Sequence, residues 1–362
     1  MDRLDILALP GDGIGPEIVT ATLEILGAAL DRVGIALDAA TEAIGFDALE
    51  QSGTTFPDAV YDAALRADGI LLGPVSHNEY PAYDKGGLNP SGELRKRLDL
   101  FANIRPARVI PGVPCRFASD PFDLVIVREN TEGFYADRNM FAGRGEFMAT
   151  PDVALAVRNV TRRASRRIAE AAFELAATRR SKVTAVHKAN VLRLSDGLFL
   201  EECRAVSASR PEIDYDERIV DAMAAHLIRN PSAYDVIVTT NMFGDILSDQ
   251  ASEMAGGLGL AASLNRGTGH AVAQAQHGSA PDIAGQDRAN PTSLILSGAM
   301  LLAWLGAKRM EPRLSEASAR IEGAVMSALS AVETRTVDLG GALGTRAFTT
   351  AVLDVVNETS GA

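Results

Sequence analysis

The sequence predicts an α/β fold. Short runs rich in Val, Ile and Leu recur along the 362 residues, and each is followed by a turn and a longer segment with helical spacing of apolar residues. The runs are almost entirely apolar, as expected of strands that helices cover on both faces. A content of 47% hydrophobic and 23% charged residues excludes a fibrous or disordered chain. The length favours roughly two domains.

The first predicted strand, residues 4–9, leads into a glycine-rich turn and a helix over residues 18–30. The turn lacks the third glycine of the G-x-G-x-x-G pattern, and Pro16 suits the first turn of a helix. We therefore favour a structural strand-to-helix turn over a dinucleotide-binding site. Further strands are predicted over residues 69–72, 124–127, 183–186 and 236–239.

Two later segments have the spacing of amphipathic helices. Residues 94–101 place Leu94, Leu98 and Phe101 on one side, and residues 164–177 have apolar residues one turn apart. Residues 137–152, by contrast, have no strong core pattern. We expect this stretch to form a loop or an arm that packs on another subunit.

Charge and composition limit the partners and the compartment. There are 35 Lys and Arg residues against 47 Asp and Glu, a net charge of −12, which argues against nucleic acid as a partner. The most apolar stretch, residues 295–305, is too short to span a membrane, and the N-terminus lacks a signal-peptide layout. Cys115 and Cys203 are the only cysteines, which favours a reducing compartment. We expect a cytoplasmic protein.

Two carboxylates one helical turn apart form the first candidate site. Asp245 and Asp249 follow the strand at residues 236–239, and a helix that begins near Phe243 places both on one face. Like charges at this spacing repel unless a cation lies between them, and paired carboxylates suit Mg²⁺ or Mn²⁺. The pair is equally compatible with one carboxylate favoured by the helix dipole and one that is solvated.

Cations at the ends of predicted elements form the second candidate site. Arg95 lies in a predicted helix, Arg105 follows it, and Arg128 ends a predicted strand. Guanidinium groups bind carboxylates through two-point contacts, so the three together would hold a polycarboxylate, whereas each alone is typical of the surface. Lys188 and Asn190 follow another strand, where α/β proteins place ligands.

Taken together, the motifs resemble the isocitrate/isopropylmalate dehydrogenase family, the metal-dependent β-decarboxylating dehydrogenases of (R)-malate derivatives. The match runs from residue 9 to beyond Trp304, and the motifs occur in the family's order. The sequence is most similar to the NAD-dependent isocitrate and homoisocitrate branch. The motifs are LPGDGIGPE (9–17), DLFANIRP (99–106), VRENTEG (127–133), HKAN (187–190), NMFGDILSD (241–249) and HGSAPDIAG (277–285).

The resemblance implies two α/β domains that share one long mixed sheet, and not a Rossmann fold. The first domain would comprise residues 1–102 plus 254–362, and the second residues 103–253. The resemblance also implies a homodimer or a larger assembly of such dimers. Each cleft between domains would borrow Lys188 and Asp221 from the other subunit.

The same resemblance assigns roles to the candidate residues. Asp245, Asp249 and the partner's Asp221 would hold Mg²⁺ or Mn²⁺, which chelates the C1 carboxylate and C2 hydroxyl of the substrate. Lys188 would assist removal of the hydroxyl proton as hydride leaves for the nicotinamide, and Tyr135 would protonate C3 after CO₂ departs. The residues expected to bind the substrate are Asn89, Ser91, Arg95, Arg105, Arg128 and Asn190.

Asp282 decides the expected cofactor. It matches the family's acidic residue that accepts hydrogen bonds from the ribose hydroxyls, and a carboxylate there would repel a 2′-phosphate. NADP-using relatives carry a basic residue and an aromatic at the positions of Asp282 and Ile283. The resemblance therefore implies NAD, bound by His277, Gly278, Ser279, Ala280, Pro281, Asp282, Ile283 and Asn290.

The segment before Arg95 is expected to recognise the C3 substituent. Isopropylmalate enzymes place a Leu pair where Ser91 and Gly92 stand, so the apolar wall for an isopropyl group is missing. Asn89 stands where isocitrate enzymes carry Ser, and its amide would donate to an extra carboxylate or would only cap the helix. We expect isocitrate or homoisocitrate first, then 3-isopropylmalate, then D-malate or tartrate.

Two rival functions remain at this point. A non-catalytic regulatory subunit is free to lose Tyr135, Lys188 and the three aspartates, yet all are present. A metal-dependent hydrolase also uses paired carboxylates but has no use for an adenosine loop with Asp282.

One departure from the family is the run Gln274-Ala275-Gln276, where many relatives carry Glu-Pro-Val. This run leaves the detail of the nicotinamide side open.

Overall fold

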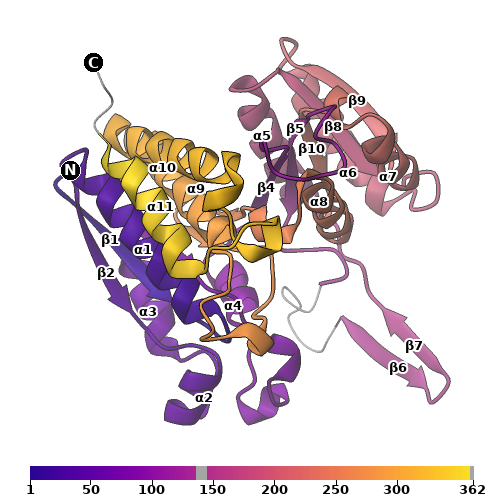
Figure 1. The fold of residues 1–362 in the computed structure, drawn as a ribbon. Helices are drawn as coiled ribbons and strands as arrows, with labels where there is room; N and C mark the ends of the chain where they lie inside the picture. Colours follow the sequence, from indigo (N-terminus) through magenta and orange to yellow (C-terminus); the bar gives the residue numbers. More distant parts are fainter. Residues whose placement is uncertain (136–144, 359–362) are drawn as a thin grey trace.

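In a computed structural model, which describes residues 1–135 and 145–358, the chain is built on one long mixed sheet (Figure 1). Neighbouring strands run parallel except at β11 and β4, which are antiparallel to each other and to their outer neighbours. The ten strands that the described residues contribute lie in the order β2 (Ala36–Thr41), β1 (Arg3–Leu9), β3 (Gly69–Leu72), β12 (Ala271–Gln274), β11 (Leu264–Arg266), β4 (Ala102–Arg108), β5 (Asp123–Glu129), β10 (Val236–Thr239), β8 (Lys182–His187) and β9 (Asp214–Ile219).

Helices cover both faces of this sheet. Over one end, the N-terminal helix packs with the three C-terminal helices, so the two termini lie in the same lobe (Figure 1). Residues 102–239 contribute the strands of the other lobe. The helices are α1 (Gly15–Asp31), α2 (Phe46–Ser52), α3 (Asp58–Arg66), α4 (Pro90–Arg97), α5 (Arg162–Ala177), α6 (Ser195–Ala208), α7 (Val220–Arg229), α8 (Asn241–Ala255), α9 (Thr292–Arg309), α10 (Pro312–Ser330) and α11 (Thr345–Asn357).

The two faces of the sheet carry different cores. Side chains alternate along each strand, so Val125 and Val127 of β5 join a continuous core with α1, α5, α6 and α9 to α11. Leu124 and Ile126 point to the opposite face and pack with α7 and α8. A separate cluster on that opposite face joins β1 and β3 to α3 and α4. The opposite face therefore has two apolar cores, and the strands between them are free to carry polar side chains.

The predicted strands at residues 4–9, 69–72, 124–127, 183–186 and 236–239 are confirmed as β1, β3, β5, β8 and β10. The predicted helices at residues 18–30 and 164–177 are confirmed as α1 and α5, and the helix expected near Phe243 begins at Asn241. The proposed division into residues 1–102 plus 254–362 and residues 103–253 stays a prediction.

The prediction of one helical stretch over residues 94–101 is wrong. Helix α4 ends at Arg97, and Asp99 has a left-handed backbone with φ +48°, which no helix continues. Leu98 and Phe101 are still buried, at 7% exposed each, because the extended chain after the turn leads directly into β4. The apolar spacing therefore reflected burial and not a helix.

The glycine turn between β1 and α1 is closed by the protein's own backbone. Gly11 and Gly13 have φ of +73° and +57°. A Cβ at Gly13 would lie 2.0 Å from the carbonyl oxygen of Ser279, and one at Gly11 would lie 2.2 Å from that of Pro74. The Ile14 N–H donates to the Ser279 carbonyl at 2.8 Å. These contacts support the structural strand-to-helix turn.

The stretch without a core pattern, residues 137–152, is described only from residue 145 onward. There, β6 (Glu146–Thr150) and β7 (Val153–Ala156) form an antiparallel hairpin that projects from the body of the molecule (Figure 1). Its apolar side chains are exposed, including Phe147 at 50%, Met148 at 60% and Leu155 at 46%. Among all described helices, none combines the length and apolarity needed to cross a bilayer.

Candidate active site

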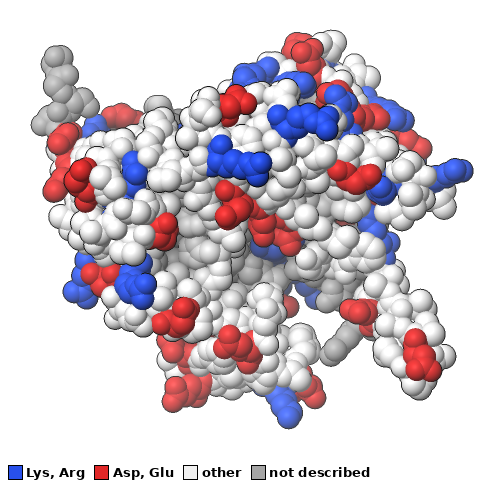
Figure 2. Space-filling view, turned by 45° about the vertical axis from the view of Figure 1, so that its right-hand side comes forward, with Lys and Arg blue, Asp and Glu red and all other residues white. Residues whose placement is uncertain are grey.

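A cleft of about 300 Å³ opens on the sheet face that carries the two separate cores. Its walls come from α4, the middle of β4, the ends of β5 and β12, the first turns of α8 and the loops after β3 and β12. It lies between the two lobes, where Figure 2 shows a hollowed surface with prominent acidic side chains beside it. The cleft brings together the predicted site residues Asn89, Ser91, Arg95, Arg105, Arg128, Tyr135, Asp245, His277 and Gly278.

Strand register places two of the arginines on the floor of the cleft. Arg128 of β5 is opposite Asn103 of β4, and Arg105 follows two residues later on the same face. Both are buried, with 7% exposure for Arg105 and 2% for Arg128. Burial and the neighbouring Arg128 lower the pKa of Arg105 to about 10, so it stays charged at neutral pH. The floor is therefore strongly cationic.

The two aspartates of α8 face these arginines. Arg105 Nη1 lies 3.2 Å from Asp245 Oδ1 and 3.4 Å from Asp249 Oδ1, and Arg128 forms a short ion pair with Asp245. The predicted placement of both carboxylates on one helix face is thus found. Burial raises the pKa of Asp249, with Asp245 adding to the rise and Arg105 opposing it. The pair attracts a cation, and its oxygen atoms suit Mg²⁺ or Mn²⁺.

Tyr135 completes this side of the cleft. Its hydroxyl donates to Asp245 Oδ2 at 3.4 Å, and the Arg128 guanidinium lies 5.9 Å from the centre of its ring. The phenol oxygen is therefore next to the carboxylates and within the same cleft as the arginines.

Lys188, Asn190 and Asp221 do not line the cleft of their own chain. Lys188 follows β8, its N–H donates to the buried Asp196 at 2.5 Å, and its Nζ forms an ion pair with Asp221. The hydrogen bond from Lys188 lowers the pKa of Asp221. Within the described part of the chain, no three His, Cys, Asp or Glu side chains gather as a metal site.

Helix α4 carries the residues expected to recognise the C3 substituent. Asn89 caps the helix, because its Oδ1 accepts a hydrogen bond from the Gly92 N–H at 3.1 Å. Ser91 Oγ donates to Gln274 Oε1 at 2.9 Å. Arg95 is one turn further along, on the same wall of the cleft. The capping role of Asn89 uses only its oxygen, so its amide nitrogen is free of that role.

The predicted cofactor residues are divided between cleft and loop. His277 and Gly278 line the cleft, and Ser279 Oγ shares a hydrogen bond of 2.7 Å with Ser76 Oγ. Ala280 adopts a left-handed backbone with φ +38° and leads into the short 3-10 turn Pro281–Ile283, on which Asp282 is exposed. Asn290 is buried and donates to Asp338 Oδ2 at 2.9 Å.

One buried atom of the loop fits a bound cofactor. His277 Nε2 is buried and finds no hydrogen-bond partner among the described residues. Burial lowers the pKa of this imidazole. A buried polar atom beside a cleft that finds no partner in the chain suits a polar ligand.

Several cleft residues were not predicted from the sequence. Pro74, Val75 and His77 follow β3, and no motif marks them. Gln274 lines the cleft, and Gln276 Nε2 donates to Asp249 Oδ1 at 3.3 Å. The signal for the two glutamines was present in the sequence, because they stand where many relatives carry Glu and Val.

Comparisons with known proteins find relatives along nearly the whole chain. The family model described as isocitrate/isopropylmalate dehydrogenase matches residues 5–356. The 3-isopropylmalate dehydrogenase of Methanothermobacter thermautotrophicus is 42% identical over 95% of this chain and 96% of its own length. The isocitrate/homoisocitrate dehydrogenase of Thermus thermophilus is 41% identical over 97% of this chain and 98% of its own.

A solved structure gives the same result. The crystal structure of isocitrate dehydrogenase from Methylococcus capsulatus matches with a TM-score of 0.87 and 39% identity, covering 98% of this chain and 100% of that one. The fold implied by the sequence motifs is thereby confirmed, and the chain is an oxidoreductase that acts on a CH–OH group. It belongs to the isocitrate/isopropylmalate dehydrogenase family.

Proposed function

We propose that this protein catalyses the NAD-dependent oxidative β-decarboxylation of a 3-substituted (R)-malate, with isocitrate or homoisocitrate as its substrate and Mg²⁺ or Mn²⁺ as its metal. The observation that carries the proposal is the convergence of Arg95, Arg105, Arg128, Tyr135 and Asp245 in one cleft beside His277. Guanidinium groups bind carboxylates, and Arg105 and Arg128 are so buried that water alone does not solvate their charge.

The protein's own residues account for binding and proton transfer. Asp245, Asp249 and the partner's Asp221 would hold the metal, and residues 277–283 with Asn290 would bind NAD. When bound, these groups supply stabilisation of developing negative charge and an acceptor for hydride. Lys188 from the second subunit would assist removal of the C2 hydroxyl proton, and the Tyr135 hydroxyl would supply a proton to C3.

The oligomeric state follows from the same assignment. Lys188 and Asp221 form an ion pair away from the cleft of their own chain, so we propose that they serve the cleft of a second subunit in a homodimer. The exposed apolar side chains of the β6–β7 hairpin favour contact with that subunit.

The two unpaired cysteines, Cys115 and Cys203, are the basis for placing the protein in the cytoplasm.

The test uses purified protein with Mg²⁺ and NAD and a panel of substrates. Isocitrate, homoisocitrate, 3-isopropylmalate, D-malate and tartrate are offered, and NADH absorbance is followed. We expect turnover that is fastest with isocitrate or homoisocitrate and is abolished by a chelator and by Asp245→Asn. Asp47→Asn, on the exposed side of α2, is the matched control and should be fully active. No NADH with any substrate would overturn the proposal.

A further inference from the structure

We propose that Gln274 is a specificity-determining residue that donates a hydrogen bond to an acceptor on the C3 substituent of the substrate. This inference deepens the proposed function and rests on it. Gln274 is the last residue of β12, and its side chain points to the same sheet face as Val272, toward the cleft that it lines.

A chain of hydrogen bonds, which we name the amide relay, fixes the orientation of that amide. It begins at Arg105, whose guanidinium only donates. Arg105 Nε donates to one atom of the Asn103 amide, and that atom must be the acceptor, Oδ1. The other atom of the amide is therefore the donor, Nδ2. Asn103 Nδ2 donates to Asn265 Oδ1 at 3.1 Å, and Asn265 Nδ2 donates to Gln274 Oε1 at 3.4 Å. Each amide in this chain accepts a hydrogen bond through its oxygen and donates one through its nitrogen. The Gln274 amide therefore accepts through Oε1.

A second donor strengthens this orientation. Ser91 Oγ of α4 donates to the same Gln274 Oε1 at 2.9 Å. The oxygen therefore has two donors, one from β11 and one from α4, and both of its lone pairs are used. Both side-chain hydrogen bonds that Gln274 makes within the described residues use this oxygen and not Nε2, and the residue lines the cleft. Its two N–H groups are thus available to a ligand.

Neighbouring residues on this wall of the cleft also present hydrogen-bond donors. Asn89 uses Oδ1 to cap α4, which leaves its Nδ2 as a donor, and Arg95 adds a guanidinium. This end of the cleft presents donors from Asn89, Arg95 and Gln274. A branched alkyl group placed against the amide nitrogens of Asn89 and Gln274 would exclude water from these donors without replacing its hydrogen bonds, whereas a carboxylate would accept from them. The wall therefore suits a carboxylate-bearing C3 substituent.

The variant Gln274→Glu tests the inference, because it replaces only the donating nitrogen with a charged oxygen of similar size. We expect the KM for isocitrate or homoisocitrate to rise about tenfold or more, with a smaller change in kcat. The KM for D-malate, which has no C3 substituent, should change by less than about threefold. Gln274→Met, which removes the donor without adding charge, should shift the KM in the same direction by a smaller factor. Gln51→Glu on exposed α2 adds the same charge elsewhere and should behave as the wild type.

The outcomes separate this inference from the proposed function. If the wild type turns over the panel but the Gln274 variants affect every substrate equally, or change only the KM for NAD, the Gln274 assignment is wrong and the activity stands. A wild type that prefers 3-isopropylmalate overturns the assignment in the same way. If the wild type oxidises nothing, the proposed function itself fails. Melting temperatures show that the variants are folded, and Gln274→Met decides the case if the charged variant is not.

Discussion

Asp282 is exposed on the loop after β12, while the residues around it are held by backbone contacts to the turn after β1. The Ser279 carbonyl that accepts from Ile14 fixes the start of this loop. A side chain on such a loop can be exchanged at little cost to stability, since exposed substitutions change it by about 0.5 kcal/mol or less. A change of its charge is therefore expected to leave the fold intact.

We accordingly predict that Asp282→Lys reduces the preference for NAD over NADP by at least about tenfold, because a cation replaces the carboxylate that repels a 2′-phosphate. The ratio of kcat/KM for the two cofactors measures the effect. Asp47→Lys, on the exposed side of α2, is a matched charge change and should leave the ratio nearly as it was. Equal ratios for wild type and Asp282→Lys would remove Asp282 from cofactor selection.

His187 ends β8 and is 8% exposed. Its Nδ1 accepts from the Ala189 N–H at 3.0 Å, which requires the neutral ring at that nitrogen. Burial lowers its pKa below the ordinary value, and Glu217 and Asp196 oppose the shift only in part. The structure thus gives His187 a structural contact at the end of the strand.

This pKa shift predicts a loss of stability in acid. Because the pKa is lower in the folded state, the unfolded chain binds the proton first as pH falls through about 6.5, and protonation then favours unfolding. The urea midpoint should therefore fall between pH 7.5 and pH 5.5. The fall should be smaller in His187→Asn, whose oxygen still accepts from Ala189. An identical fall in both proteins would show that other groups control the acid limb.

Helix α4 combines a capping residue with a wall of the cleft. Asn89→Ala removes the acceptor for the Gly92 N–H and should cost about 1 kcal/mol of unfolding free energy. Asn89→Asp keeps an acceptor at the cap but loses the amide donor, so its stability should stay near that of the wild type while the KM for a C3 carboxylate rises. Urea denaturation and steady-state kinetics on the two variants separate the roles. A normal KM in Asn89→Asp would leave Asn89 as a helix cap alone.

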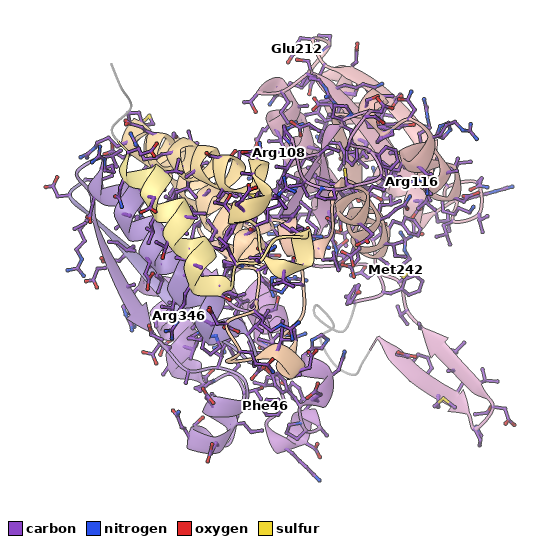
Figure 3. The ribbon with its side chains drawn as sticks, in the orientation of Figure 1. Phe46, Arg108, Arg116, Glu212, Met242 and Arg346 are labelled. Carbon is purple, nitrogen blue, oxygen red and sulfur yellow. The ribbon has the colours of Figure 1, made fainter. Side chains whose placement is uncertain are left out.

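The two lobes also contact each other on the side of the sheet opposite to the cleft. On that side, Arg108, labelled in Figure 3, pairs with Glu322 of α10 at 3.3 Å. The continuous core on that face joins α5 and α6 of one lobe to α1 and α9 to α11 of the other. One face of the sheet thus provides the connection between lobes, and the other, with its divided core, provides the space for a ligand.

A mixing experiment tests the proposed sharing of residues between subunits. Asp221→Asn and Asp245→Asn should each be inactive as homodimers. When the two variants are unfolded together and refolded, about a quarter of the wild-type activity should return, because half of a random mixture is heterodimer and each heterodimer has one intact cleft. Refolding each variant alone is the control. If mixing restores nothing while light scattering shows dimers, Asp221 does not serve the partner's cleft.

Local sequence determined much of this protein. Apolar runs of four to six residues identify strands because a strand buried on both faces must be apolar along its whole length, and β3 and β10 have the bounds that were predicted. The helical spacing of Asp245 and Asp249 likewise places both on one face, since the geometry of a helix is set within one turn. The order of the motifs was sufficient to indicate the family.

Tertiary structure alone decided how the cleft is built. Nothing local in the sequence brings Asn103, Asn265 and Gln274 into one line, because their contact depends on the register of β4, β11 and β12. Asn103 and Asn265 are 162 residues apart in the sequence. The same holds for the end of α4 at Arg97, where a left-handed Asp99 overrode an apolar spacing that suits a longer helix. Sequence spacing records what a residue needs from its neighbours along the chain, whereas the direction of a buried amide depends on partners that only the folded sheet supplies.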